Sequence, residues 1–574
     1  MRIVEVTIEK FRSIKQATFR MNDITAVVGE NNAGKTAVLR ALNAVLNYSY
    51  EETSFINKIH QFAPRNNSHI TVIFDDVPET PIYQEKMYNG RLTLKFSYSY
   101  SDNRKKYTVV RGRETIVADD AFLEQISKDI LYVYIPAGRT NKDVSWSDDS
   151  IFRELISNYV ARHTENRDRI SGYVRKATEK IHDSVFIKLE KEINALYMQN
   201  KEMNFQIGFP DTLDYTVLLR NTEISLRGEG SDYLLREWGS GTKSIAIIAM
   251  HRANALLKGG SIVLGIEEPE INLHPQAQKR FILSLKNEMQ ESETQAIFTT
   301  HSTVLVDELE HDDILLVRRE HDHSRGFYSV ISQLGADFWR RYNIEEFKHY
   351  QYFHYKNSEF FFSKFVVIGE SKNDCQVFEK LVFPEIRDKI ADVSFLDAGG
   401  VESLKYPYFL LKELHIPFVV VVDRDFFFPY ANNNELDKSR NASTGLPTYG
   451  YQLKSNEVIA DLFKSAPEKT AVEEAHKKGY RAFFEVISQY HILSMNYCLE
   501  MDLSCSSKAR EEYYRILNIL PSNQNQRHLL VENKRSIKDI GKITRIIDSI
   551  PKSALPESFN KIRNQLVCEI NQIV

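Results

Sequence analysis

A glycine-rich loop near the N-terminus constrains the fold of this 574-residue chain more than any other feature. The apolar run Ile24–Val28 precedes the loop Gly29–Thr36, and residues Ala37–Leu46 follow it with helical apolar spacing. In such a strand–loop–helix unit, glycines let backbone N–H groups turn toward phosphates, and the helix N-terminus adds its dipole. Lys35 is expected to reach the β and γ phosphates and Thr36 to ligate magnesium, whereas a glycine-rich turn without a ligand is the alternative. The nucleotide-binding residues predicted here are Gly29, Asn32, Gly34, Lys35 and Thr36.

Size and composition favour a cytoplasmic protein of several domains. The chain is too long for a single hydrophobic core and should form roughly three or four domains. Its net charge is −4, so any contact with DNA requires a local basic surface. The four cysteines lack Cys-x-x-Cys spacing, which disfavours a disulfide framework or a structural zinc site. No stretch approaches the roughly 18 apolar residues that cross a membrane, and the N-terminus lacks a signal peptide, so no membrane association is expected.

Three further segments extend the predicted nucleotide site. The apolar strand Ser261–Ile266 ends in the carboxylates Glu267 and Glu268, and carboxylates in this position of a parallel sheet face the nucleotide crevice. Glu267 is expected to hold magnesium through water and Glu268 to orient the attacking water, although a solvated acidic turn is the alternative. Trp238–Ser244 opens a helix with a Gly-Ser-Gly turn, and Ala296–Ser302 is a strand that ends in a histidine. The Gly-Ser-Gly turn and the histidine are each weak evidence alone, and the order of the segments along the chain is the stronger evidence for a nucleotide site.

Together these segments resemble the ATP-binding-cassette head of the SMC class. In that class, the signature segment of one subunit covers the ATP held by another. The resemblance therefore implies a dimer, with Ser240 and Gly241 contacting the γ-phosphate in trans and His301 sensing it in cis. Two residues depart from the class, because Glu267 stands where aspartate is usual and Ser240 where a glycine is usual. Both departures would slow hydrolysis, yet magnesium would keep an oxygen ligand.

A helical insert lies within the ATPase sequence. Apolar residues recur with a period of 3.6 from Ile151 to Met198, interleaved with lysine and glutamate, which predicts two or more amphipathic helices. The insert precedes the signature segment, where heads of this class carry their insertion. It is interpreted as a dimerisation arm, and core helices of the head are the alternative.

An acidic set follows in the second half of the chain. The strand Lys364–Gly369 is followed by Glu370, and the apolar strand Pro417–Val422 ends at Asp423 and Asp425. Alternating buried strands and helices imply a parallel sheet, which brings these carboxylates to one edge. Carboxylates so placed form an oxygen-rich site for Mg²⁺ or Mn²⁺. An isolated Asp-x-Asp is often a turn, so the prediction depends on the whole set.

With a glycine pair at Gly399 and Gly400, this set resembles the TOPRIM domain of topoisomerases, primases and related nucleases. The usual Glu-Gly pair appears here as Glu370-Ser371, which alters the backbone approach but keeps the carboxylate.

A second metal site is predicted from residues farther along. Glu500 and Asp502 follow an apolar segment and are expected to complete this site with Asp374. Two metal ions about 4 Å apart would activate the attacking water and stabilise the leaving oxygen. Lys534 is a candidate for neutralising the transition-state phosphate, and a solvated surface charge is the alternative for that residue.

The whole order resembles the OLD (overcoming lysogenization defect) family of ATP-dependent nucleases. The implied fold class is α/β, with an ABC-type P-loop ATPase, a helical dimerisation insert, and a Rossmann-like TOPRIM domain with C-terminal helices. The predicted segments are 1–150 and 201–345 for the ATPase head, 151–200 for the insert, 363–510 for the TOPRIM domain and 511–574 for the helical extension. The metal-site residues implied by the resemblance are Glu370, Asp374, Asp423, Asp425, Glu500 and Asp502.

Two hypotheses of different classes follow. The first is a DNA endonuclease in antiphage defence, regulated by ATP and dependent on Mg²⁺ or Mn²⁺, acting as a homodimer or a dimer of dimers. The resemblance implies that it works alone, with a helicase as in Gabija-type systems, or with a retron reverse transcriptase and its DNA. The second is a nucleotide-dependent scaffold that binds DNA or a partner through an inactive TOPRIM domain. A topoisomerase is less favoured, because it needs a tyrosine nucleophile and the sequence marks none of the 29 tyrosines.

Overall fold

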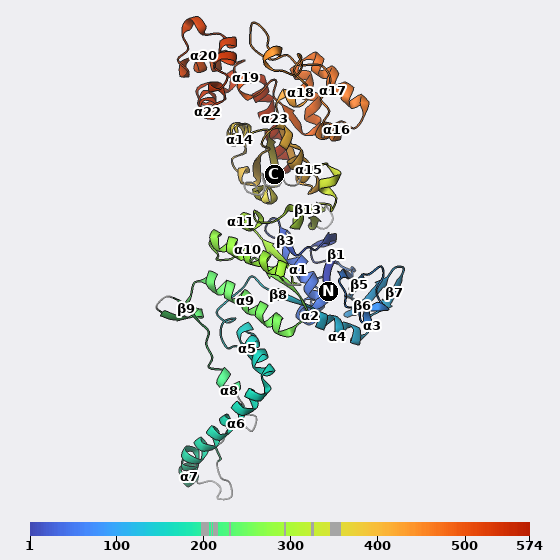
Figure 1. Cartoon of the computed structure of the whole chain (residues 1–574), viewed down its shortest axis with the longest axis vertical. Coiled ribbons are helices and arrows are strands. Elements are labelled where there is room, and N and C mark those ends of the chain that lie inside the picture. Colours follow the sequence, from blue (N-terminus) through green and yellow to red (C-terminus); the bar gives the residue numbers. More distant parts are fainter. Residues whose placement is uncertain are drawn as a thin grey trace. The chain divides into compact units, whose positions relative to one another are not determined.

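The computed structural model describes residues 1–196, 206–207, 209, 216–228, 231–291, 294–322, 326–344 and 358–574 (Figure 1). Residues 197–200, at the predicted end of the insert, lie outside the described residues. So do residues 201–205 and residue 345, at the two ends of the predicted second part of the head. The chain divides into two compact units. Unit 1 comprises Met1–Glu308 with Val317–Ile331, and unit 2 comprises Leu309–Leu316 with Ser332–Val574.

A 12-stranded sheet dominates the first half of the chain, with strand order β7-β6-β5-β4-β1-β2-β14-β13-β3-β12-β11-β8. Its strands are β1 (Arg2–Phe11), β2 (Ile14–Arg20), β3 (Ile24–Val28), β4 (Ser68–Asp75), β5 (Leu92–Ser99), β6 (Arg104–Arg111), β7 (Glu114–Val117), β8 (Ile130–Ile135), β11 (Ser261–Glu267), β12 (Gln295–Thr300), β13 (Ile314–Asp322) and β14 (Gly326–Ser332). Strands β3, β12, β11 and β8 are parallel, and β1, β2 and β4 to β7 pair antiparallel. Strands β3, β11 and β12 are buried along their whole length, as expected of parallel strands with both faces covered. Their carboxyl ends therefore present polar residues at one edge.

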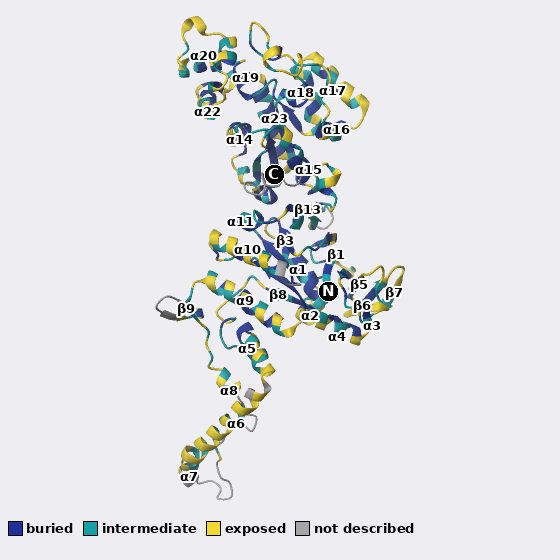
Figure 2. Ribbon diagram, in the orientation of Figure 1, coloured by how far each residue is buried: buried dark blue, intermediate teal, exposed yellow. Residues whose placement is uncertain are grey.

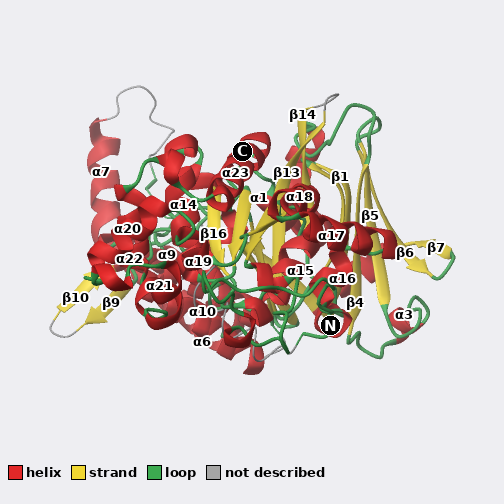
Figure 3. Cartoon of the chain, turned by 90° about the horizontal axis from the view of Figure 1, so that it is seen from above, coloured by secondary structure: helices red, strands yellow, loops and turns green. Residues whose placement is uncertain are grey.

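Helices of unit 1 flank this sheet, and a separate hairpin stands apart from it (Figure 3). These elements are α1 (Lys35–Leu46), α2 (Tyr48–Ile56), α3 (Pro81–Gln84), α4 (Asp120–Asp129), α5 (Ile151–Arg162), α6 (Thr164–Ile181), α7 (Ile187–Leu196), α8 (Thr216–Leu219), α9 (Ser240–Lys258), α10 (Pro275–Glu291), α11 (Thr303–Val306) and the hairpin β9 (Ser225–Gly228) with β10 (Ser231–Leu234). None of the described helices is both long and apolar enough to cross a membrane.

The predicted insert contains α5, α6 and α7. Helix α5 begins in the core of unit 1, where Ile151 and Phe152 pack against Leu235, Ile247 and Met250. Helices α6 and α7 extend away from the sheet and are largely exposed (Figure 2). Their exposed apolar side chains include those of Ile170, Tyr173, Ile181 and Leu189. This arrangement is the one expected of an arm, whereas core helices would bury those side chains.

Unit 2 is built on a smaller parallel sheet with strand order β16-β15-β17-β18. Its strands are β15 (Phe365–Gly369), β16 (Val393–Asp397), β17 (Phe418–Val422) and β18 (Ile492–Ser494). Its helices include α14 (Lys372–Ile386), α15 (Lys405–Glu413), α16 (Glu457–Leu462), α17 (Ala466–Lys478), α18 (Tyr480–Ile487), α19 (Leu499–Leu503), α20 (Ser507–Ile516), α21 (Gln526–Glu532), α22 (Ile540–Ser549) and α23 (Glu557–Ile573). The predicted α/β fold class is confirmed.

The C-terminal helices share the hydrophobic core of the unit 2 sheet. Phe559 and Leu566 of α23 belong to the same buried cluster as Phe365 and Val367 of β15 and Val377 of α14. The tail, which was predicted only as a helical extension without readable chemistry, is therefore part of the packing that supports the edge of this sheet.

Candidate nucleotide and metal sites

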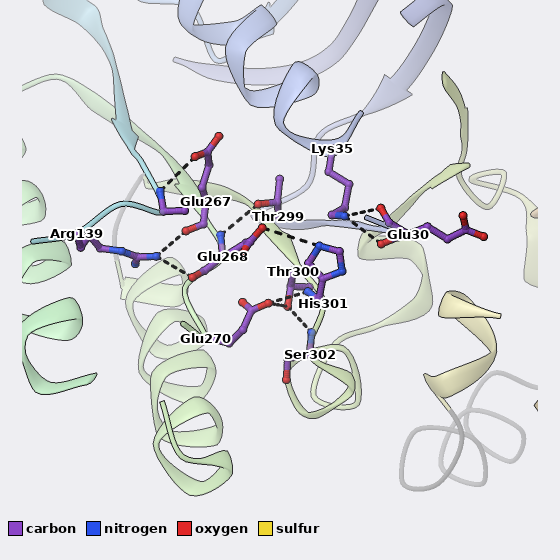
Figure 4. Close-up of polar contacts among 12 residues, drawn as sticks. Glu30, Lys35, Arg139, Glu267, Glu268, Glu270, Thr299, Thr300, His301 and Ser302 are labelled. Carbon is purple, nitrogen blue, oxygen red and sulfur yellow. Dashed lines mark hydrogen bonds and ion pairs between the residues drawn. The ribbon is translucent and has the colours of Figure 1, made fainter. Parts of the chain in front are cut away.

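The glycine-rich loop of unit 1 adopts a geometry that only its glycines permit. Gly34 caps α1 with φ 107°, and a Cβ there would lie 2.2 Å from Ser329 Oγ. Lys35 Nζ donates to the carbonyl oxygens of Gly29 at 3.0 Å and Glu30 at 2.8 Å (Figure 4). Burial lowers the pKa of Lys35 to about 8, so its ammonium remains mostly charged at neutral pH. The loop thus presents a buried cation beside the N-terminus of a helix, which suits bound phosphates.

The remaining predicted loop residues lie in the same turn. Asn32 has φ 59°, and Thr36 is the second residue of α1. Their position at the beginning of the helix is the one that a phosphate-binding loop requires.

The carboxylate turn follows β11, which is separated from β3 by β12 in the sheet. The Glu267 side chain is buried, and its Oε2 accepts a hydrogen bond from Ala137 N at 3.2 Å. Within the described part of the chain, Glu267 Oε1 is buried without a hydrogen-bond partner. Glu268 N donates to Thr299 O of β12 at 3.0 Å, which ties the turn to the adjacent strand. A buried, unpaired carboxylate oxygen next to a phosphate-binding loop fits a magnesium ion or its water ligand.

The histidine after β12 lies beside this turn. His301 Nε2 is 3.9 Å from Glu268 Oε1. Burial, with a further contribution from Lys35, lowers the pKa of His301 and favours its neutral form. Glu270 Oε1 accepts hydrogen bonds from His301 N at 2.7 Å and the Thr300 hydroxyl at 2.9 Å (Figure 4). Glu270 therefore builds the turn that aims the histidine toward Glu268.

The predicted signature residues open α9. Gly239 precedes the helix, Ser240 is exposed and a Cβ on Gly241 would lie 2.4 Å from Asn272 O. A side chain at Gly241 would therefore collide with the segment that follows the carboxylate turn. Exposure of Ser240 at a helix N-terminus is compatible with contact to a phosphate carried by another subunit.

Arg139 is a site residue that the sequence did not reveal. Its Nη2 donates to the carbonyl oxygens of both Glu267 and Glu268 at 2.7 Å (Figure 4). It follows β8, whose Ile135 pairs with Ile266 of β11, so the two strands end side by side. Parallel strands end at one edge of a sheet, which places Arg139 beside Glu267. This placement could be predicted only if β8 were known to pair with β11.

The acidic set of unit 2 converges at the carboxyl ends of β15 and β17. These strands are parallel neighbours in which Gly369 pairs with Val421. Asp423 N donates to Glu370 Oε2 at 3.1 Å. Glu370, Asp423 and Asp425 each offer a carboxylate oxygen within 4.8 Å of the others. Three anionic oxygens at this spacing fit a divalent cation.

Electrostatics at this cluster agree with its spacing. Burial raises the pKa of Glu370 to about 7, and Asp425 and Asp374 add to the rise. Burial and the Glu370 charge raise the pKa of Asp423 well above its ordinary value. Crowded anions disfavour one another's ionisation, and a divalent cation among them would reverse that effect. The carboxylates present therefore suit a metal ion.

The residues predicted for a second metal site have different surroundings. Asp374 forms a capping box with Ser371, the N-cap of α14, because its Oδ2 accepts from Ser371 Oγ at 2.6 Å and Ser371 N at 2.9 Å. Burial raises its pKa to about 6, with Glu500 and Asp397 adding to the rise. Asp502 accepts hydrogen bonds from the backbone N–H groups of residues 496 and 497 at 2.8 and 2.9 Å. Asp374 and Glu500 lie close enough to Asp423 for their charges to raise its pKa. Asp502 instead holds the backbone of residues 496 and 497. Ser371 stands at the usual glycine position because it caps the helix.

Lys538, and not the predicted Lys534, lies beside the acidic residues of unit 2. Lys534 Nζ lies 3.7 Å from Asp437 Oδ2, whereas Lys538 Nζ lies 3.2 Å from Glu500 Oε1. The Glu500 charge raises the pKa of Lys538, so its ammonium stays charged. Lys538 belongs to the C-terminal tail, and no sequence pattern distinguishes it from Lys534, four residues earlier.

The fold and the two sites define a P-loop ATPase domain joined to a TOPRIM domain. Residues 24–307 match an AAA domain family, AAA_21, and residues 361–425 match the overcoming lysogenization defect protein-like TOPRIM domain. In this order of domains the chain is similar to the OLD family.

Relatives of known name agree with this assignment. The OLD nuclease of Thermus scotoductus is 26% identical over 73% of this chain and 81% of its own length. Endonuclease GajA of Bacillus cereus is 21% identical over 74% of this chain and 75% of its own length. These relatives and the TOPRIM match support a nuclease of the OLD family. Among solved structures, the SMC head domain from Thermotoga maritima aligns with 58% of this chain and 100% of that chain, at 16% identity and a TM-score of 0.32.

Proposed function

We propose that this protein is an ATP-regulated DNA endonuclease that hydrolyses phosphodiester bonds with Mg²⁺ or Mn²⁺. The observation that carries the proposal is the convergence of Glu370, Asp423 and Asp425 within 4.8 Å of one another. Supercoiled plasmid DNA incubated with the protein and Mn²⁺ tests it, because nicking or linearisation should require the metal and stop on chelation. Unchanged plasmid under every metal and nucleotide condition would contradict it.

The chemistry proposed for unit 2 uses two metal ions. Glu370, Asp423 and Asp425 would hold one ion, and Asp374 with Glu500 would take part in holding the other. Bound divalent ions lower the pKa of a water nucleophile and stabilise the leaving oxygen of an in-line displacement. The chain itself contributes the fixed carboxylate positions, since α14 and β17 each anchor one side of the set.

Lys538 is proposed to neutralise charge that develops on the scissile phosphate. Lys538→Ala is expected to slow plasmid cleavage by about 100-fold, because a positioned donor lost from a developing charge costs that much. Lys534→Ala should have a smaller effect, since its ammonium lies beside Asp437. Initial cleavage rates at saturating Mn²⁺ measure both. The reverse order of effects would return the role to Lys534.

Unit 1 is proposed to bind ATP with magnesium and to act as a switch. Lys35 would bind the phosphates, Thr36 and Glu267 would hold the magnesium ion, and Glu268 would orient the attacking water, with His301 beside it. ATP would join two heads, because Ser240 and Gly241 lie at an exposed helix N-terminus. The homodimer, or a dimer of dimers, would use the α6 and α7 arm as a further contact.

Mixing two inactive variants tests the trans arrangement. Lys35→Ala and Ser240→Arg should each lack ATP turnover as homodimers. A mixed dimer should regain one competent site, because the first variant supplies an intact Ser240 to the intact loop of the second. Phosphate release after subunit exchange measures this. No regain in mixtures that demonstrably form mixed dimers would place the signature segment in cis.

A role in cytoplasmic antiphage defence extends this proposal. The family assignment supports it, either for the chain alone or with a helicase or a retron reverse transcriptase and its DNA. Phage plating on cells that carry the wild-type gene in its native setting, compared with the Glu370→Gln variant, tests it. Equal plating efficiencies across phages would contradict the defence role while leaving the nuclease activity intact.

The second candidate is a nucleotide-dependent scaffold with an inactive TOPRIM domain. Glu267 and Ser240 favour it, since both depart from the residues usual in ATP-hydrolysing heads. Mn²⁺ calorimetry on the full chain separates the candidates, because a scaffold should not bind ions tightly through Glu370 and Asp423.

A further inference from the structure

A tyrosine side chain touches the carboxylate cluster of unit 2. The Tyr430 hydroxyl donates a hydrogen bond to Asp425 Oδ2 at 3.2 Å. Asp425 lies in the short turn Arg424–Phe426 after β17, beyond the hydrogen-bond ladder of the sheet. Within the described part of the chain, this is the one side-chain hydrogen bond recorded for the Asp425 carboxylate. The orientation of Asp425 therefore depends on Tyr430.

The ring of Tyr430 is itself fixed by an aromatic ladder. Tyr430 stacks on Tyr449 with ring centroids 5.4 Å apart and an interplanar angle of 23°. Tyr449 stacks on Tyr497 at 6.3 Å and 26°. An isolated antiparallel bridge joins the backbones of Tyr430 and Tyr449. The ladder, formed by Tyr430, Tyr449 and Tyr497, limits the positions that the Tyr430 hydroxyl can take.

The far end of the ladder reaches the segment that carries Glu500. Tyr497 O accepts a hydrogen bond from Arg424 N at 2.9 Å, and Tyr497 N donates to Asp502 Oδ1 at 2.9 Å. Asp502 is on α19, the helix that also carries Glu500. The two parts of the acidic set, one after β17 and one on α19, are thus connected through stacked rings and backbone hydrogen bonds.

The hydrogen bond makes Tyr430 a donor to the carboxylate cluster. A phenol hydroxyl that donates to a carboxylate positions that carboxylate, whereas a tyrosine nucleophile needs its oxygen free to attack. The geometry favours a donor to Asp425 over a covalent role.

We propose that Tyr430 is a positioning residue that orients Asp425 for metal binding. Its O–H occupies one acceptor site of Oδ2 and leaves the other lone pairs of the carboxylate for a divalent ion. The inference rests on the proposed metal-dependent function, and it gives the carboxylate cluster a hydrogen-bonded outer layer. Asp425 needs this support because the chain leaves the sheet at Asp423, so the backbone hydrogen bonds between strands do not hold Asp425 in place.

Manganese calorimetry on the full chain tests this assignment. Tyr430→Phe keeps the stacked ring and removes only the hydroxyl. It should weaken Mn²⁺ binding by about 10-fold or more, the range found when an outer-layer partner of a metal ligand is lost. Tyr451→Phe is the matched control, because Tyr451 lies two residues after Tyr449, outside the ladder, and is 61% exposed. Its Mn²⁺ affinity should equal that of the wild type.

A double-mutant cycle distinguishes positioning from a general structural effect. In the Asp425→Asn background, Tyr430→Phe should cause no further loss of Mn²⁺ affinity, because its action passes through Asp425. An equal additional loss in that background would overturn the proposal, as would wild-type affinity in Tyr430→Phe alone. Wild-type protein that binds no Mn²⁺ would instead refute the proposed metal function and this inference with it.

Denaturing gels of protein incubated with labelled DNA give a second readout. The proposal expects no protein–DNA adduct that survives denaturation. A stable adduct that forms with the wild type and disappears in Tyr430→Phe would assign Tyr430 as a nucleophile and overturn the positioning role.

Discussion

Glu370→Gln should abolish metal binding at the cluster of Glu370, Asp423 and Asp425 and slow DNA cleavage by roughly 1,000-fold or more, the upper range for losing one stabilising group at a developing charge. Glutamine has nearly the same shape, but it removes one of the three anionic oxygens that lie within 4.8 Å of one another. The Asp423 N–H can still donate to the amide oxygen, so the fold should persist. Plasmid cleavage rates and Mn²⁺ calorimetry measure the two effects.

Glu379→Gln supplies the control for this change. Glu379 is exposed on α14, the helix that carries Asp374 in its first turn, so the substitution alters net charge equally without touching the cluster. Its cleavage rate should match that of the wild type. Equal cleavage by Glu370→Gln and the wild type would remove the cluster from the reaction.

Lys35→Ala should weaken ATP binding by about 10- to 100-fold, since a hydrogen bond to a charged group contributes about 1.5–3 kcal/mol and each 1.4 kcal/mol is tenfold. Mn²⁺ binding at Glu370 should be unchanged, because that cluster is built entirely within unit 2. A fluorescent ATP analogue measures the affinity. Any ATP dependence of cleavage should disappear in this variant.

The pH dependence of ATP binding gives a signature specific to Lys35. Its pKa of about 8 means that the ammonium is lost as the pH rises through 8, so wild-type affinity should decline over that range. Bound phosphate would favour the charged lysine and move the decline upward. Lys35→Ala should lack this decline. Lys279→Ala, which removes an exposed lysine paired with Glu308, should bind ATP and respond to pH as the wild type does.

Local sequence patterns predicted the positions of the candidate residues that lie at the ends of strands. Glu267 ends β11 and Glu370 follows β15, while Lys35 follows β3 after the glycine-rich loop. Within each sheet, parallel strands bring such positions to one edge. The predicted architecture, with an ATPase domain followed by a TOPRIM domain, is confirmed. It was predictable because long apolar runs that end in polar residues indicate buried parallel strands with functional residues at their ends.

Contacts made across the fold were not predictable in this way. Lys538 and Tyr430 reach the acidic set from a turn and a loop whose paths depend on tertiary packing. Asp502, by contrast, was predicted as a metal ligand from its place after an apolar segment, but its side chain has other partners. Glu500 and Asp502 are two residues apart, but on a helix such neighbours do not face each other, so they point to different surroundings. Asp502 consequently binds backbone N–H groups while Glu500 meets Lys538.

Anomalous X-ray scattering from crystals grown with Mn²⁺ would locate the metal ions of unit 2. Manganese should be bonded to oxygens of Glu370, Asp423 and Asp425 in the wild type, and that peak should be absent in Glu370→Gln. Well-ordered carboxylates with no manganese among them, at a concentration that supports DNA cleavage, would contradict the proposed metal site.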